Sequence, residues 1–284
     1  VLTRTDERIV EVRVRKRQRE VVAGEPVMEE CGRRRGRAVP RLVIRGGRDR
    51  QRERCDLAGH VRGERDVVVR ATIVVEHHAG RGERLRPLTD TTPKPLLEVH
   101  GKPLIVYHLE ALANAGFTNV VINLSWLGEQ IRARLGNGAD FGVSIEYSEE
   151  KQALETAGGI QQALPLLSER FIVVNADVFT DYDFTALRAA DSPAHLVLVD
   201  NPQHNDRGDF SLEQARVGNS GSPLHTFSGI AQYHRSFFAG LGPGKQALAP
   251  LLRKAADDGL VSGELFQGVW IDIGTVERLA QLND

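Results

Sequence analysis

Aromatic residues are absent from the first 70 positions of this 284-residue sequence, since all 16 Phe, Trp and Tyr residues come later. A stretch of that length without aromatic side chains buries too little apolar area to offset the conformational entropy lost on folding. We therefore expect one folded domain over residues 71–284. An Arg-rich segment, residues 1–70, precedes it and is not expected to share its core.

Cysteine is also scarce: Cys31 and Cys55 are the only two, and both lie before the expected domain. This excludes a disulfide framework and a cysteine-based zinc site in the folded part. No apolar run approaches the roughly 18 residues of a membrane span. The beginning of the sequence is charged from Arg4 onward and lacks the apolar core of a secretion signal, so a cytoplasmic protein without a membrane partner is expected.

The net charge of -1 conceals two unlike parts. Residues 1–70 hold 20 basic and 12 acidic residues (+8), and the rest hold 17 and 26 (-9). The run Arg33-Arg34-Arg35-Gly36-Arg37 has the charge of a nucleic-acid or lipid patch. Its near lack of Lys is instead typical of a GC-rich gene read out of frame, so we expect a disordered or spurious extension and no nucleic-acid partner. A small folded element is the remaining alternative.

From residue 71 the pattern becomes that of an α/β protein. Short β-branched runs predict strands at 72–75, 119–124, 143–147, 171–175, 196–199 and 226–233. Amphipathic stretches predict helices at 103–115, 127–135, 157–167, 248–256 and 276–282. This alternation favours a mainly parallel mixed sheet with helices on both faces, in which ligands bind beyond the carboxyl ends of the strands.

A glycine-containing loop follows the first predicted strand. Gly80 and Gly82 allow a tight turn that presents main-chain N–H groups to an anion. Arg84 and Lys94 add positive charge near the same anion. The loop is neither a dinucleotide fingerprint nor a Walker A motif, because the third glycine and the Gly-Lys-Ser/Thr end are both missing.

Residues 79–96 resemble the signature of sugar-1-phosphate nucleotidyltransferases, Gly-x-Gly-x-Arg-Leu-x-Pro-Leu-Thr followed by Pro-Lys-Pro-Leu. Segments 154–159, 174–178, 207–210, 226–230 and 270–275 also match this family. The resemblance implies a Rossmann-like nucleotidyltransferase fold. It also implies transfer of a nucleotidyl group from a nucleoside triphosphate to a sugar 1-phosphate, with release of pyrophosphate.

The compact chain lacks the β-helix extension of many relatives. Within the family this points to uridylyl transfer from UTP to N-acetylmuramate α-1-phosphate, a step of peptidoglycan recycling. Mannose 1-phosphate with GTP, and glucose 1-phosphate with UTP or dTTP, remain open. A non-catalytic nucleotide-sugar sensor or scaffold is an alternative of another class.

The resemblance also implies roles for individual residues. Asp177 and Asp272 are expected to hold Mg²⁺, since carboxylates are hard oxygen ligands, and Arg84 and Lys94 are expected to be catalytic. The expected nucleotide-binding residues are Ala79, Gly80, Gly82, Glu83, Arg84, Lys94, Glu155, Gly158 and Asn175. The expected sugar-binding residues are Val178, Gly208, Asp209, Ser228 and Gly229.

The sequence departs from the family just before the loop. Relatives have an apolar strand running into Leu-Ala-Ala-Gly, whereas this chain has Glu76-His77-His78-Ala79-Gly80. Family-like sequence thus begins at Ala79. A frameshift near this point explains the departure, and otherwise the imidazole of His78 is expected to crowd the nucleobase pocket.

Overall fold

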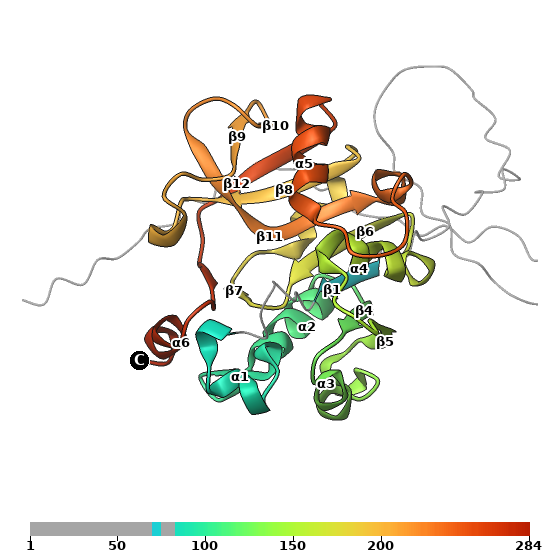
Figure 1. Ribbon diagram of the computed structural model, residues 1–284, viewed down its shortest axis with the longest axis vertical. Coiled ribbons are helices and arrows are strands. Elements are labelled where there is room, and N and C mark those ends of the chain that lie inside the picture. The colour runs from blue at the N-terminus through green and yellow to red at the C-terminus, as the bar shows by residue number, and fades with distance from the viewer. Residues whose placement is uncertain (1–69, 75–82) are drawn as a thin grey trace, which may run out of the picture. The chain divides into compact units, whose positions relative to one another are not determined.

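The computed structural model describes residues 70–74 and 83–284 (Figure 1). Three of the predicted phosphate-loop residues, Ala79, Gly80 and Gly82, lie outside this range, as do His77 and His78. The predicted Arg-rich segment also lies outside it, except for Arg70. These expectations therefore remain predictions. All described residues fall within one compact unit, Gly63–Asp284.

A nine-stranded sheet forms the centre of the fold, in the order β5-β4-β1-β6-β11-β8-β12-β10-β9. Its first four strands are parallel to one another. They are β5 (Ser144–Glu149), β4 (Asn119–Leu124), β1 (Arg70–Val74) and β6 (Arg170–Asn175).

The direction of the chain changes at β11 (Leu224–His234), which is antiparallel to β6 and pairs Ile230 with Val174. Beyond it lie β8 (Ala194–Val199), β12 (Val261–Phe266), β10 (Arg216–Gly218) and β9 (Phe210–Glu213). The predicted mixed sheet is therefore confirmed. Four neighbouring parallel strands form the half that contains β1, and β8 and β12 form a second parallel pair in the other half.

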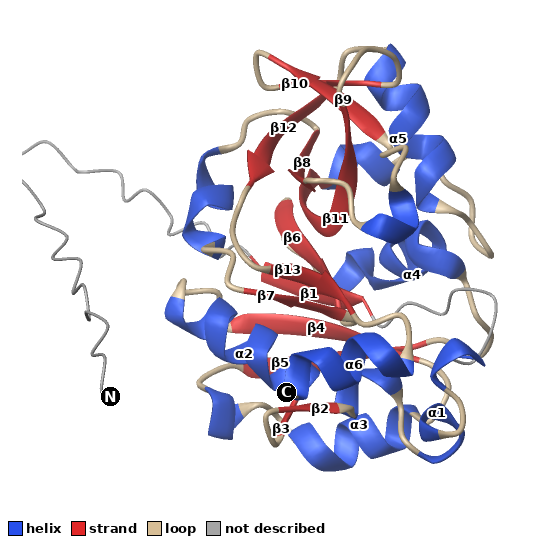
Figure 2. Cartoon of the chain, turned by 90° about the vertical axis from the view of Figure 1, so that its left-hand side faces the viewer, coloured by secondary structure: helices blue, strands red, loops and turns tan. Residues whose placement is uncertain are grey.

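Helices cover both faces of the sheet, as predicted. One face packs against α2 (Leu104–Asn114) and α3 (Gly128–Leu135), and the other against α4 (Glu155–Ala163) and α5 (Leu248–Asp257). Alternate residues of β6 enter the two cores, because successive strand side chains point to opposite faces. Figure 2 shows α5 beside β9 and β10 at one end of the molecule, with α2 and α3 at the other.

Most predicted boundaries lie within two residues of the observed ones, but the helix predicted at 157–167 is α4, Glu155–Ala163. A 3₁₀ turn, Leu164–Leu166, follows it. Pro165 accounts for the early end, because proline lacks a main-chain N–H and its ring collides with the preceding helical turn.

Two small sheets lie outside the large one. β7 (Val178–Thr180) pairs with β13 (Trp270–Asp272), and β2 (Glu98–Val99) pairs with β3 (Lys102–Pro103). The short helix α1 (Leu88–Thr91) precedes β2, and α6 (Val276–Asn283) ends the chain. A third apolar cluster joins α6 to the β2–β3 hairpin through Val99, Ile273 and Leu279.

Within the described part of the chain, no helix has both the length and the apolar character needed to cross a membrane.

Candidate active site

Two carboxylates meet beyond the carboxyl end of β6. Asp177 lies in the short turn between β6 and β7, and Asp272 is the last residue of β13. The antiparallel pairing of β7 and β13 places Asp272 opposite Val178. The main-chain N–H of Ile273 also donates a 2.8 Å hydrogen bond to the carbonyl of Asp177. The structure therefore brings together the two predicted metal ligands, 95 residues apart in sequence (272 − 177).

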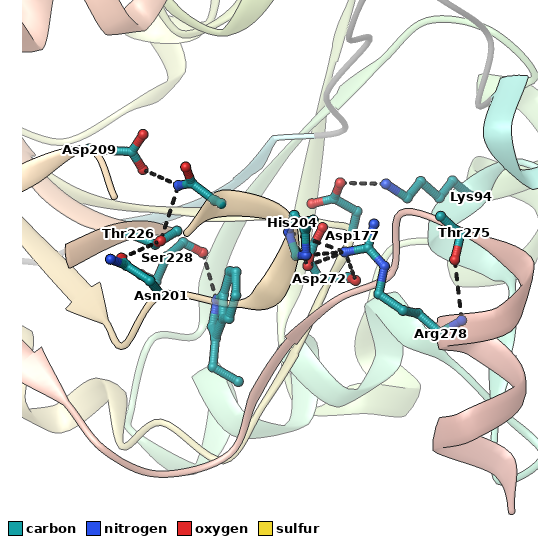
Figure 3. Close-up of polar contacts among 12 residues, drawn as sticks. Lys94, Asp177, Asn201, His204, Asp209, Thr226, Ser228, Asp272, Thr275 and Arg278 are labelled. Carbon is teal, nitrogen blue, oxygen red and sulfur yellow. Dashed lines mark hydrogen bonds and ion pairs between the residues drawn. The ribbon is translucent and has the colours of Figure 1, made fainter. Parts of the chain in front are cut away.

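Each carboxylate has its own cationic partner (Figure 3). The ammonium of Lys94 is paired with Asp177, and the guanidinium of Arg278 is paired with Asp272. His204 lies 3.1 Å from the same Asp272 oxygen, measured from its Nε2 atom. The side chains of Lys94 and Asp177 are 23% and 26% exposed, so a ligand in solution can reach both.

Arg278 and His204 were not predicted as site residues. Thr275 caps α6 by accepting a 3.3 Å hydrogen bond from the N–H of Arg278. This start of α6 directs the Arg278 guanidinium back to Asp272, whose carbonyl it also contacts at 3.1 Å. The cap sequence Gly274-Thr275 signals the helix start, but nothing near His204 in sequence indicates its contact with Asp272.

The two carboxylates suit a hard divalent cation such as Mg²⁺. In the described range, no group of three or more His, Cys, Asp or Glu side chains is arranged to hold a metal ion. In proteins Mg²⁺ is usually bound by one or two carboxylates, and waters and substrate phosphates complete its shell. The donor set of Asp177 and Asp272 therefore fits the predicted ion.

Arg84 lies in a 3₁₀ turn, Glu83–Leu85, and its side chain is exposed. The adjacent Leu85 is fully buried in the third apolar cluster, which anchors the turn. The structure does not describe the side chain of Glu83. The proposed contacts of Arg84 and Glu83 with phosphate remain predictions.

A bulge in β11 packs against the end of β6. The register with β8 shifts between Phe227 and Ile230, and Gly229 adopts φ +78°. A Cβ atom on Gly229 would lie 2.6 Å from the Nδ2 atom of Asn175, so the close approach requires glycine here. Asn175 is thus fixed at the edge of the site, two residues before Asp177.

The hydroxyl of Ser228 is part of this bulge. It is buried, donates a 2.6 Å hydrogen bond to the carbonyl of Val197 and accepts one from the N–H of Ile230. Its side chain therefore has a structural position in the bulge. A contact with sugar remains a prediction for Ser228, as it does for Gly229.

Asp209 connects the loop after β8 to β11. Its Oδ2 atom accepts hydrogen bonds from the N–H of Phe227 at 2.9 Å and from the amide of Asn205 at 3.2 Å. The preceding Gly208 adopts φ +68°. These contacts hold the loop that carries His204, and the predicted sugar contacts of Gly208 and Asp209 are untested.

Glu155 and Gly158 lie in the first turn of α4. Glu155 adopts φ +57° and pairs with Lys245 at 3.1 Å. A Cβ atom on Gly158 would collide with the carbonyl of Gly244, and the N–H groups of Ala157 and Gly158 both donate to Gln246. The structure thus shows Gly158 as the close contact between α4 and the loop before α5, while its predicted nucleotide contact is untested.

His108 lies behind the carboxylate turn, on α2. Burial lowers the pKa of His108 to about 4, although its hydrogen bond to the main chain of Val178 and the charge of Asp177 oppose this shift. The imidazole is therefore neutral at neutral pH. Val178 itself is 2% exposed, so its side chain belongs to the core beneath the site, and its predicted substrate contact is untested.

Comparison with known proteins identifies the family. The profile of the nucleotidyl transferase family matches residues 77–210. N-acetylmuramate alpha-1-phosphate uridylyltransferase from Neisseria meningitidis is 54% identical over 215 residues, covering 72% of this chain and 93% of that protein. The chain belongs to the nucleotidyl transferase family.

One further relative and one solved structure show that this nucleotidyl transferase is also similar to proteins named for other sugars and nucleotides. The catalytic subunit beta of mannose-1-phosphate guanylyltransferase from Drosophila pseudoobscura is 43% identical over 122 residues, which cover 42% of this chain and 32% of that subunit. A crystal structure described as a glucose-1-phosphate thymidylyltransferase from Bacillus anthracis superposes with a TM-score of 0.66 at 21% identity, over 76% of this chain and 94% of that one. The latter likeness confirms the predicted fold.

Proposed function

We propose that this nucleotidyl transferase transfers a uridylyl group from UTP to N-acetylmuramate α-1-phosphate and requires Mg²⁺. The observation that carries the proposal is the meeting of Asp177 and Asp272 with Lys94 at the carboxyl end of β6. The choice of substrates is supported by the 54% identity to the Neisseria meningitidis enzyme over 93% of its length. This reaction would serve the recycling of peptidoglycan.

The reaction requires no general base from the protein. A phosphate oxygen of the sugar 1-phosphate forms a bond to the α-phosphorus, and the bond from that phosphorus to the bridging oxygen of pyrophosphate breaks. Pyrophosphate leaves with the electron pair. Since the attacking phosphate is already anionic near neutral pH, catalysis depends on in-line positioning and on neutralising negative charge.

The residues of the site can supply both the positioning of the substrates and the neutralisation of their negative charge. Lys94 is a compact cation that can bind an oxygen of the triphosphate, as lysines in other phosphate sites do. Asp177 and Asp272 would hold Mg²⁺, which when bound neutralises phosphate charge. Arg278 and His204 both contact the Oδ1 atom of Asp272 and hold this carboxylate in place.

The guanylyltransferase alternative is supported by the 43% identity to the Drosophila pseudoobscura subunit. That similarity covers only 32% of the subunit, so it supports shared triphosphate chemistry more strongly than a shared sugar. A non-catalytic sensor is less well supported, because a sensor has no need for two carboxylates paired with cations at the edge of the sheet.

Pyrophosphate release tests the proposal. The full chain would be incubated with UTP, GTP or dTTP, each combined with the 1-phosphate of N-acetylmuramate, mannose or glucose, with and without EDTA. We expect the fastest release with UTP and N-acetylmuramate 1-phosphate, and its loss with EDTA until excess Mg²⁺ is added. Faster release with another pair would identify that pair as the substrates. Release unaffected by EDTA would contradict the proposed requirement for Mg²⁺.

A further inference from the structure

The bulge in β11 leaves main-chain groups without strand partners. Phe227 pairs with Leu198 and Ile230 with Val197, so Ser228 and Gly229 both fall between two consecutive residues of β8. The carbonyl of Ser228 therefore cannot take part in the regular ladder between these strands. Buried main-chain groups of this kind need another partner.

Trp270 supplies that partner. Its indole Nε1 donates a 2.9 Å hydrogen bond to the carbonyl of Ser228. Trp270 is half-buried and is the first residue of β13, opposite Thr180 of β7. Because an indole N–H can only donate, this contact requires the edge of the ring that carries Nε1 to face the Ser228 carbonyl.

The contact closes a ring of interactions around the two carboxylates. From Trp270, β13 leads in two residues to Asp272, which is opposite Val178. From Ser228, the bulge leads to Gly229, where an added Cβ atom would lie within 2.8 Å of the Asn175 side chain. Asn175 and Asp177 are separated only by Ala176, and the Ile273–Asp177 hydrogen bond completes the ring.

We propose that Trp270 is a positioning residue, whose indole N–H holds the Ser228–Gly229 bulge against Asn175 and so fixes the spacing between Asp177 and Asp272. This inference rests on one part of the proposed function, namely that the Asp177 and Asp272 carboxylates act in catalysis. It requires no contact between Trp270 and either substrate. It gives a role to a residue that lies in the family-like segment 270–275 and for which the resemblance implied none.

Trp270→Phe is the direct test, because it removes the donor and keeps an aromatic ring. Kinetics would use whichever triphosphate and sugar phosphate the wild-type chain converts fastest. We expect kcat to fall by about tenfold or more, with both KM values within about threefold, since misplaced reacting groups slow the chemical step. The matched control is Tyr147→Phe, which removes a 2.6 Å hydrogen bond from the Tyr147 hydroxyl to the carbonyl of Gly136. It should lower stability without lowering kcat.

Two results would overturn the inference. One is a kcat for Trp270→Phe within about twofold of wild type. The other is a selective rise in the KM for the sugar phosphate, which would mean that the ring contacts the substrate directly.

Nuclear magnetic resonance tests the contact without relying on activity, and so also covers the case in which Trp270→Phe fails to fold. The sequence contains two tryptophans, so two indole N–H signals are expected, and Trp126→Phe assigns them. Gly229→Ala, which forces a methyl group toward Asn175, should shift the Trp270 signal and lower kcat. An unmoved Trp270 signal in Gly229→Ala would overturn the inference, whether or not the wild-type chain is active. A wild-type chain that transfers no nucleotide would refute the proposed function and leave the inference standing.

The double variant Trp270→Phe/Gly229→Ala tests whether Trp270 and Gly229 act through the same structural unit or independently. Residues that act through one structural unit give non-additive effects. We expect the loss of kcat in the double variant to be smaller than the product of the two single losses. Losses that multiply fully would contradict the proposed coupling.

Discussion

The main-chain N–H of Ile273 donates its hydrogen bond to the carbonyl of Asp177, at 2.8 Å. This bond extends the β7–β13 pairing by one step and carries it to the edge of the site. Asp177 and Asp272 are therefore held on paired main-chain segments, which allow little variation in their separation. Preorganisation of this kind matters for catalysis, because charged groups already in place need no rearrangement during the reaction.

We predict that Asp177→Asn and Asp272→Asn each lower turnover by at least about 10², the scale expected when one preorganised electrostatic group is lost. Asparagine keeps the shape of the side chain and removes its charge. Steady-state pyrophosphate release at saturating substrate and Mg²⁺ measures the effect, and circular dichroism checks the fold.

Asp140→Asn is the matched control for these two variants. Asp140 is an exposed residue of the 3₁₀ turn Ala139–Phe141, which leads into the amino end of β5, whereas Asp177 follows the carboxyl end of the parallel strand β6. Its replacement should leave turnover unchanged. Near-normal turnover in Asp177→Asn or Asp272→Asn would exclude that residue as a ligand of the metal.

We predict that Lys94→Ala chiefly raises the KM for the triphosphate. The variant removes a cation that can bind a phosphate oxygen and leaves Asp177 without its ion-pair partner. Lys254→Ala is the control, because it removes an ion pair with Asp258, at 2.5 Å, at the carboxyl end of α5. If only the KM for the sugar phosphate rises in Lys94→Ala, then Lys94 belongs to the other half of the site.

Much of the site could be predicted because its residues belong to local patterns. The apolar run of β6 predicts a central strand, and Asp177 follows its carboxyl end, where α/β sheets bind ligands. Strand β4 was predicted with its observed bounds, Asn119–Leu124, because its run of β-branched residues is compact and bounded by polar ones. The positive charge of the loop made Lys94 a candidate, and the family resemblance then implied the role of Asp177 and Asp272 as metal ligands.

The rest depends on contacts between distant segments. Strands β7, β10 and β13 have only three residues each, too few for a periodic pattern to be detected. The contact of His204 with Asp272 joins residues 68 positions apart (272 − 204), and that of Trp270 with Ser228 joins residues 42 apart. Such pairs are set by packing of the whole fold, so no local sequence signal shows them.

We predict that Gly158→Ala destabilises the protein by about 1–3 kcal/mol, the usual cost of forcing a methyl group into a packed position. The new Cβ would press on the Gly244 carbonyl and lies near the main-chain N of Gln246. Gly240→Ala is the control, because a Cβ there meets no atom within 4 Å. Urea unfolding compares the two. Unchanged stability with a raised KM for the triphosphate would instead support the predicted nucleotide contact of Gly158.

His108 should make stability depend on pH. Its pKa of about 4 in the folded chain lies below the roughly 6.5 of an exposed histidine. Between these values the unfolded chain binds a proton that the folded chain does not, so stability falls as pH decreases from 6.5 to 4. By this linkage we expect His108 to contribute about 2 kcal/mol to the difference in unfolding free energy between pH 7 and pH 4.5. We predict that His108→Gln reduces that difference by about this amount, measured by urea unfolding at both pH values, since glutamine does not titrate.

His100→Gln, at an exposed position on the β2–β3 hairpin, should keep the wild-type difference in unfolding free energy between the two pH values. If both variants keep it, another group is responsible for the loss of stability in acid, and the imidazole of His108 is protonated in the folded protein at a higher pH than its burial implies.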